Sequence, residues 1–190
     1  MDKKQPNPVG RPRSEEARDA VLNAVDDLLV EIGYAAMTMK NIAERAGVSR
    51  QTVYRWWSTK GQILFEACAI DAKDELAISP SGDLRTDVSN YLEALVVFLT
   101  ASPAGLAYRA LIGEAQHSAE IADLLKTADL LGDSARAVVA GHKVGSSRDQ
   151  AADLAITRLV APVFYWILSG RDPAALSTKR LAREFLAALS

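Results

Sequence analysis

The sequence predicts an all-α protein, and three observations support this. Apolar residues recur at helical spacing in every long segment. No segment shows a convincing alternation of apolar and polar residues, which a half-buried strand would require. Ser and Thr residues stand where most of these segments would begin, as helix N-caps do. At 190 residues, 49% of them hydrophobic and 24% charged, the chain is ordinary for a globular protein and long enough to bury a sizeable core.

A basic arm and one helix open the chain. Prolines and Gly10 discourage regular structure in residues 1–13, so we predict a flexible arm there. Ser14 is placed to cap the first helix. An apolar stripe follows at helical spacing, and Gly33 stands where the helix would end.

Two short helices joined by a tight turn come next. Thr38 is a good N-cap for the first, and Gly47 stands where a residue in the left-handed region would end it. Ser49 caps the second helix, on which Val53 and Trp57 are four residues apart and point inward together. This order of cap, turn and cap predicts a helix-turn-helix, a motif that binds DNA.

The polar faces of this helix pair carry groups suited to DNA. Arginine offers forked donors to guanine, glutamine offers an amide to adenine, and hydroxyls bond to phosphates. Residues 36–65 contain five basic residues and one acidic residue, a net charge of +4 in a chain whose total is −2. Such a local basic patch is expected of a site-selective DNA binder. An ordinary helical hairpin with a polar solvent face remains the alternative at this point.

Further helices fill the rest of the chain. Thr59 is placed to cap a fourth helix that runs to about Ala77, and a Ser-Pro-Ser-Gly segment then breaks the chain. We predict the later helices over residues 84–99, 103–116, 118–138, 149–168 and 177–189. We therefore divide the chain into the arm (1–13), a helix-turn-helix domain (14–60), a connecting helix and linker (61–82), and a helical ligand-binding and dimerisation domain (83–190).

The helix predicted over residues 149–168 is apolar nearly all round. A helix without a polar face must be covered on both sides, and the same helix pair from a second copy is the simplest cover. The alternative is that one monomer covers both sides itself. The candidate interface residues of the homodimer are Ile156, Leu159, Val160, Val163, Ile167, Leu181, Phe185 and Leu189.

The helix-turn-helix residues resemble the signature of the tetracycline-repressor family of bacterial regulators. The resemblance rests on the order Thr38, Ile42-Ala43, Ala46-Gly47-Val48-Ser49, Tyr54, Trp57, Lys60 and Leu64, with an upstream Gly10-Arg11-Pro12-Arg13 arm. It implies that Arg50, Gln51 and Thr52 face bases, whereas Thr38, Tyr54 and Lys60 hold phosphates. The full candidate set for a double-stranded operator is Arg11, Arg13, Thr38, Lys40, Ser49, Arg50, Gln51, Thr52, Tyr54, Arg55 and Lys60. Many members have histidine where this chain has Arg55 and Trp56.

The resemblance also implies a repressor that a small-molecule effector releases from DNA. Two copies related by a two-fold axis would read a near-palindromic operator. Candidate residues for the effector pocket are Tyr91, Phe98, Tyr108, His117 and Trp166. Aromatic side chains on helix faces are more often core residues, and a lone histidine is more often a surface or core polar residue than a ligand contact.

Other classes of protein find little support in the sequence. It shows no phosphate-binding glycine pattern, no nucleophile elbow, and no metal-ligand spacing among its two histidines and one cysteine, so we predict no enzyme, metal or cofactor. The longest apolar run, residues 159–168, is shorter than the roughly 20 residues of a membrane span. We expect a cytoplasmic protein. A protein-interaction module with a vestigial helix-turn-helix is the remaining rival.

Overall fold

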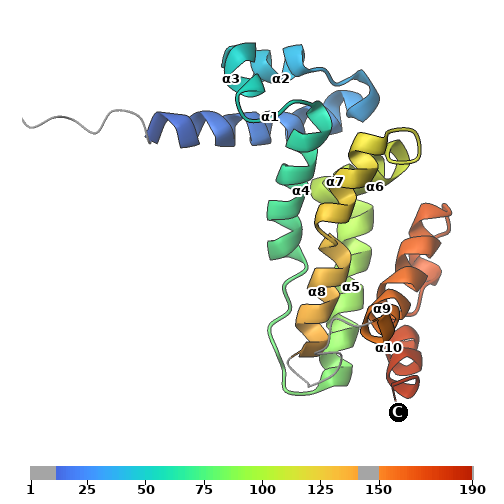
Figure 1. Cartoon of the computed structure of the whole chain (residues 1–190). Helices are drawn as coiled ribbons and strands as arrows, with labels where there is room; N and C mark the ends of the chain where they lie inside the picture. The colour runs from blue at the N-terminus through green and yellow to red at the C-terminus, as the bar shows by residue number, and fades with distance from the viewer. Residues whose placement is uncertain (1–11, 141–149, 190) are drawn as a thin grey trace, which may run out of the picture. The chain divides into compact units, whose positions relative to one another are not determined.

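Residues 12–140 and 150–189 are described by the computed structural model, and every regular element in them is a helix (Figure 1). The predicted all-α class is therefore confirmed for this part of the chain. The chain divides into two compact units, Met1–Ala67 and Cys68–Ser190, and the boundary between them falls within one helix. Among the described residues, no single helix is long and apolar enough to cross a membrane, and one pair of helices, bent by 74°, passes that test only when both are counted together.

The first unit contains α1 (Pro12–Ala36), α2 (Met39–Arg45), α3 (Arg50–Tyr54) and the start of α4 (Lys60–Glu75). Helix α1 begins at Pro12, two residues before the predicted cap at Ser14. Proline suits a first helical turn because its ring fixes φ and its missing N–H has no partner to lose there. Gly33 interrupts the helix with a φ of 75°, which agrees with the predicted end.

The core of the first unit is built from the inward faces of its helices. Val21 and Val25 of α1, Ile42 of α2 and Val53 of α3 are fully buried. The sequence places the end of this domain at residue 60, whereas the compact unit continues to Ala67. Ile63 and Leu64, in the first turns of α4, are fully buried and therefore belong to a core.

The second unit is organised around one long helix. Helix α5 (Leu84–Ala101) packs against α6 (Pro103–Glu114), α8 (Leu130–Ala140), α9 (Gln150–Leu168) and α10 (Thr178–Ala187). Figure 1 shows α5 and α8 running side by side. Helix α7 (Ala119–Thr127) packs on α6, and the short 3-10 helix η1 (Pro173–Ala175) lies between α9 and α10 in the chain.

Hydroxyl caps start the helices where the sequence placed them. Each cap oxygen accepts the backbone N–H three residues ahead, which leaves that N–H satisfied. The predicted caps Thr38 and Ser49 are confirmed, and Ser102, Ser118 and Ser177 cap α6, α7 and α10 in the same way.

One predicted helix is divided in the structure. The sequence predicts a single helix over residues 118–138, but α7 ends at Thr127 and α8 starts at Leu130. Ala128 is extended, with φ −148° and ψ 120°, and Asp129 Oδ1 accepts from the N–H of Gly132 at 3.0 Å. The aspartate side chain thus competes with the continuing helix for a backbone donor and starts a new helix instead.

Candidate nucleic-acid interface

The turn between α2 and α3 is fixed by side chains at both helix starts. Thr38 Oγ1 accepts from Asn41 N at 3.2 Å, while Asn41 Oδ1 accepts from Thr38 N at 2.8 Å. Gly47 adopts a φ of 66°, which lets the chain leave α2 without strain. Ser49 Oγ accepts from Thr52 N at 3.1 Å and starts α3. The predicted helix-turn-helix is therefore present, with reciprocal capping at Thr38.

The inner side of α3 is held by buried contacts. Val53 is fully buried, and Trp57, just beyond the helix, is almost fully buried. The indole Nε1 of Trp57 donates to Glu66 Oε2 at 2.9 Å, and Arg18 of α1 forms an ion pair with the same glutamate. This arrangement joins α3, α4 and α1 through one carboxylate, so the outward face of α3 has a fixed orientation within the unit.

Four polar or aromatic side chains occupy the outward face of α3 and its C-terminal end. Arg50, Gln51, Tyr54 and Arg55 are all exposed, and 53% of Tyr54 is accessible. With the exception of Arg50, they line one open hollow on the surface, together with Ser49 and Thr52. A five-residue helix that presents an arginine, an amide and a phenol outward carries the donors and acceptors that base edges and phosphates require.

An arginine–tryptophan stack extends this face. The guanidinium of Arg55 lies 4.6 Å from the centre of the Trp56 ring, a cation–π contact. Trp56 in turn meets Trp57 edge to face, with ring centroids 5.5 Å apart. The side chain of Arg55 is thereby held in place before any ligand arrives. This contact was not predicted from the sequence, although the Arg-Trp-Trp run is a signal that points to it.

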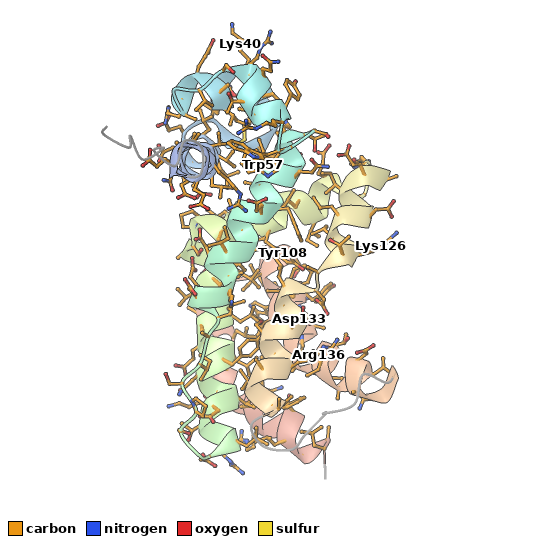
Figure 2. The ribbon with its side chains drawn as sticks, turned by 60° about the vertical axis from the view of Figure 1, so that its left-hand side comes forward. Lys40, Trp57, Tyr108, Lys126, Asp133 and Arg136 are labelled. Atoms are coloured by element: carbon orange, nitrogen blue, oxygen red, sulfur yellow. The ribbon has the colours of Figure 1, made fainter. Side chains whose placement is uncertain are left out.

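Not every basic residue of the predicted patch is directed to solvent. Arg45 Nη1 donates to Glu31 Oε1 at 2.8 Å and to Asp27 Oδ2 at 3.4 Å, so it ties α2 to α1. Its hydrogen bond lowers the pKa of the Glu31 carboxyl, and Glu31 raises the pKa of Arg45. Lys40 forms an exposed pair with Glu44 at 3.7 Å and points outward from α2 (Figure 2). The positive charge that this surface presents to DNA is therefore smaller than the number of basic residues in 36–65 indicates.

Lys60, predicted to hold a phosphate, makes contacts within the protein. Its Nζ donates to the carbonyl oxygens of Tyr34, at 2.8 Å, and Met37, at 3.0 Å, and lies 4.2 Å from the centre of the Tyr34 ring. These contacts hold the chain between α1 and α2 against the start of α4. The geometry supports a structural role for Lys60, and the phosphate contact stays a prediction.

The remaining DNA-binding candidates have varied surroundings. Thr38 is exposed, and because its oxygen accepts in the cap, its O–H stays available to donate. Thr52 is half-buried, with its hydroxyl 2.9 Å from Ser49 Oγ. Arg11 lies outside the described residues, and Arg13 lies within α1 but its side chain is not among those described.

The five aromatic and histidine candidates in the second unit are not brought together around one cavity. Tyr91 is fully buried, and its hydroxyl donates to Leu131 O at 3.0 Å. Phe98 is also a core residue, His117 is exposed beyond α6, and Trp166 Nε1 donates to Asp172 O at 2.8 Å. Of the five, Tyr108 lines a cavity of about 230 Å³ between α6, α8 and α9.

Most predicted dimer residues are buried within the monomer. Their side chains already belong to the core of the second unit, where α9 and α10 pack on α5. The buried ones are Ile156, Leu159, Val163, Ile167 and Phe185, whereas Val160 and Leu181 are half-buried and Leu189 is exposed. The monomer thus covers one side of α9 but not both. The exposed apolar side chains of α9 are instead Leu154, Pro162, Tyr165 and Leu168.

Comparison with known proteins identifies both units. Residues 21–67 match the family model described as "Bacterial regulatory proteins, tetR family", and residues 78–188 match "Tetracyclin repressor-like, C-terminal domain". The HTH-type transcriptional regulator YdeS of Bacillus subtilis (strain 168) is 33% identical over 167 residues, which are 86% of this chain and 84% of that protein. The DNA-binding transcriptional repressor TetR of Mycobacteroides abscessus is 33% identical over 113 residues, or 58% of this chain and 59% of that protein.

Solved structures have the same fold. The TetR-family transcription regulator SCO0332 is 28% identical, with a TM-score of 0.70 over 92% of this chain and 99% of that one. GusR of Salmonella enterica is 18% identical, with a TM-score of 0.64 over 96% and 99% of the two chains. The helix-turn-helix, the helical second unit and these matches agree. The chain belongs to the tetR family of bacterial regulatory proteins, helix-turn-helix transcriptional regulators that bind DNA.

Proposed function

We propose that this protein is a transcriptional repressor, and not an enzyme, that binds a near-palindromic operator as a homodimer in the cytoplasm and leaves it when a small-molecule effector binds. The exposed face of α3 is the observation that carries this proposal. The hydrogen bond between Trp57 and Glu66 holds the opposite side of α3 in place, so the exposed side chains would contact DNA in a defined orientation. Repression, in particular, is supported by the repressor from Mycobacteroides abscessus among the relatives.

Each exposed side chain of the interface has a distinct part in this proposal. Arg50 and Gln51 lie in the first turn of α3 and would reach base edges in the major groove. Tyr54 and the hydroxyl of Thr38 would donate to phosphates, which sets the register of the protein on the duplex. Arg55, held by Trp56, would add a preoriented guanidinium beside them.

The outer face of α9 is the surface we propose for dimerisation. Leu154, Pro162, Tyr165 and Leu168 lie on one side of this helix, and 63% of Tyr165 is accessible. A two-fold axis beside α9 would bury this strip against itself in an isologous interface. Tyr165→Glu should then yield monomers in light-scattering measurements. Val97→Glu is the matched control, since Val97 of α5 is an equally exposed apolar residue (59%) away from this face.

A DNase footprint on DNA flanking the gene tests the proposal as a whole. We expect two protected half-sites with their centres about one helical turn, or a multiple of it, apart, in a near-palindromic sequence. A gel shift at several salt concentrations should show affinity falling as salt rises, because bound counterions are released. Binding that is equal for all sequences, or protection of a single half-site by a dimer, would contradict it.

A further inference from the structure

The cavity between α6, α8 and α9 has features that define the class of its ligand. We propose that it binds a small organic cation, with a compact apolar body and one ammonium group, and that this ligand is the effector. The inference rests on the proposed function for the effector role, but the ligand class follows from the cavity itself. Tyr108, which lines the cavity, lies among the helices of the second unit (Figure 2).

The walls of the cavity are apolar and aromatic. Tyr108 of α6 and Phe164 of α9 meet edge to face there, with ring centroids 6.2 Å apart and planes at 66°. Aliphatic side chains complete the wall, namely Ile112, Leu131, Ile156, Val160 and Ala161. Such a wall favours an apolar body, and aromatic faces also attract cations.

The charged lining of the cavity is negative. Among the described residues that line it, Asp129 is the ionisable acid, and no lysine, arginine or histidine joins it. An anionic ligand would therefore meet a carboxylate without a compensating cation, whereas an ammonium group would find a partner. The nearest guanidinium, on Arg136, does not neutralise Asp129 fully, because it also pairs with Asp133, at 3.8 Å, and Asp153, at 2.9 Å.

The carboxylate of Asp129 is held in position. Its Oδ1 accepts from Gly132 N at 3.0 Å, in the first turn of α8. A Cβ atom at residue 132 would lie 1.8 Å from Asp129 Oδ2, so a larger residue there would displace the carboxylate. This hydrogen bond lowers the ordering cost that the Asp129 side chain would have on binding a cation.

The phenol of Tyr108 supplies a second polar contact. Burial raises the pKa of Tyr108, and the negative charge of Asp129 raises it further, so the hydroxyl stays protonated at neutral pH. Among the described residues, no hydrogen bond to this hydroxyl is found, in contrast to that of Tyr91. Its oxygen can accept from an ammonium group that also pairs with Asp129.

The size of the cavity limits the ligand. At about 230 Å³ it is larger than the roughly 150 Å³ cavity that holds benzene and smaller than most drug-sized sites. One ring with a chain of two or three atoms fits this range. The probe is therefore 2-phenylethylammonium, with 2-phenylethanol as its neutral analogue and 3-phenylpropanoate as an anionic one.

Calorimetry with the full-length protein tests the ligand class. We expect the amine to bind at least tenfold more tightly than the alcohol, and the carboxylate more weakly than both. Equal affinity for amine and alcohol, or no binding of the amine at millimolar concentration, would overturn the proposal.

Two variants locate the site, and a third is the control. Asp129→Asn retains an oxygen for the Gly132 N–H but removes the charge, so it should reduce amine affinity to that of the alcohol. Gly132→Ala should do the same by displacing the carboxylate. Asp133→Asn is the matched control, because the side chains of Asp129 and Asp133 are 60% and 63% exposed and both lie 3.8 Å from Arg136. Asp133 lines a separate groove between α4 and α8. Loss of amine binding in the Asp133→Asn variant alone would place the site in that groove and refute our proposal.

Operator binding, measured in parallel, separates this inference from the proposed function. Amine binding that leaves the operator complex intact would refute the effector role while the ligand class stands. A protein that holds its operator but does not bind the amine would refute the ligand class alone.

Discussion

The ammonium nitrogen of Lys60 lies 3.0 Å from the carbonyl oxygen of Met37, and it donates to the carbonyl of Tyr34 as well. Lys60→Met keeps the length of the side chain but leaves both carbonyls without their charged donor. We expect it to lower the free energy of unfolding by about 1–3 kcal/mol, measured by urea denaturation. The salt dependence of operator binding should not change.

Lys126→Met is the control for this prediction, because Lys126 is an exposed lysine that pairs only at the surface, with Asp123 at 2.9 Å. Surface pairs contribute little, so this variant should be nearly as stable as the parent. If Lys60→Met were instead stable and reduced the salt slope by about one unit, Lys60 would be a phosphate contact after all.

The hydrogen bond between Arg45 and Glu31 predicts a pH dependence of stability. Because this bond lowers the pKa of Glu31 below its ordinary value of 4.5, its contribution is present above that pH and is lost as the pH falls through the lowered value. Glu31→Gln should therefore lower the melting temperature at pH 7, and the difference from the parent should close in acid. Glu16→Gln, an exposed acid on the same helix, is the control. A difference that persists unchanged at about pH 3 would contradict this explanation.

Gly105 of α6 lies directly against the backbone of α5. A Cβ atom there would lie 1.7 Å from the carbonyl oxygen of Phe98, a backbone atom that cannot move aside alone. Gly105→Ala should destabilise the second unit by at least about 1–3 kcal/mol, as overpacking does. Gly113→Ala on the same helix has no atom within 4 Å of the added methyl group and should instead stabilise it by about 0.5–1 kcal/mol. Denaturation curves of the two variants should shift in opposite directions.

Local signals in the sequence account for most of the helices. A Ser or Thr hydroxyl needs only the N–H three residues ahead to act as a cap, so Thr38, Ser49 and Ser177 could be identified from their neighbours alone. The break at Asp129 was harder to predict, since apolar residues continue at helical spacing on both sides of it. In the structure, the hydrogen bond between Gly132 N and the Asp129 side chain starts a new helix despite the continuous apolar periodicity. The sequence alone does not show which of these two signals decides the local structure.

The site was less predictable because its contacts join distant parts of the chain. The count of basic residues could not show that Arg45 pairs with Glu31 or that Lys60 turns toward Met37. Periodicity identified α9 as buried on several sides, but only packing shows that Ile156 faces the core while Tyr165 faces outward. Surface charge and interface both depend on tertiary partners that spacing along the sequence does not encode.

The first turn of α3 gives the most direct test of base recognition. Arg50 and Gln51 are exposed there, and they follow the cap at Ser49, whose hydrogen bond fixes the start of the helix. Replacing either by alanine should cost about 1–3 kcal/mol of operator affinity and relax preference at particular base pairs, because a bidentate contact to a base edge is lost. Competition binding with operators altered at single positions measures both effects.

Arg183→Ala removes an equally exposed arginine from α10 and should leave operator affinity and preference as they are. A uniform loss of affinity for all sequences in Arg50→Ala or Gln51→Ala, with preference retained, would assign that residue to the phosphate backbone instead. In that case base recognition would have to come from other side chains of the same face, with Arg55 the first to test, because Trp56 already holds its guanidinium in place.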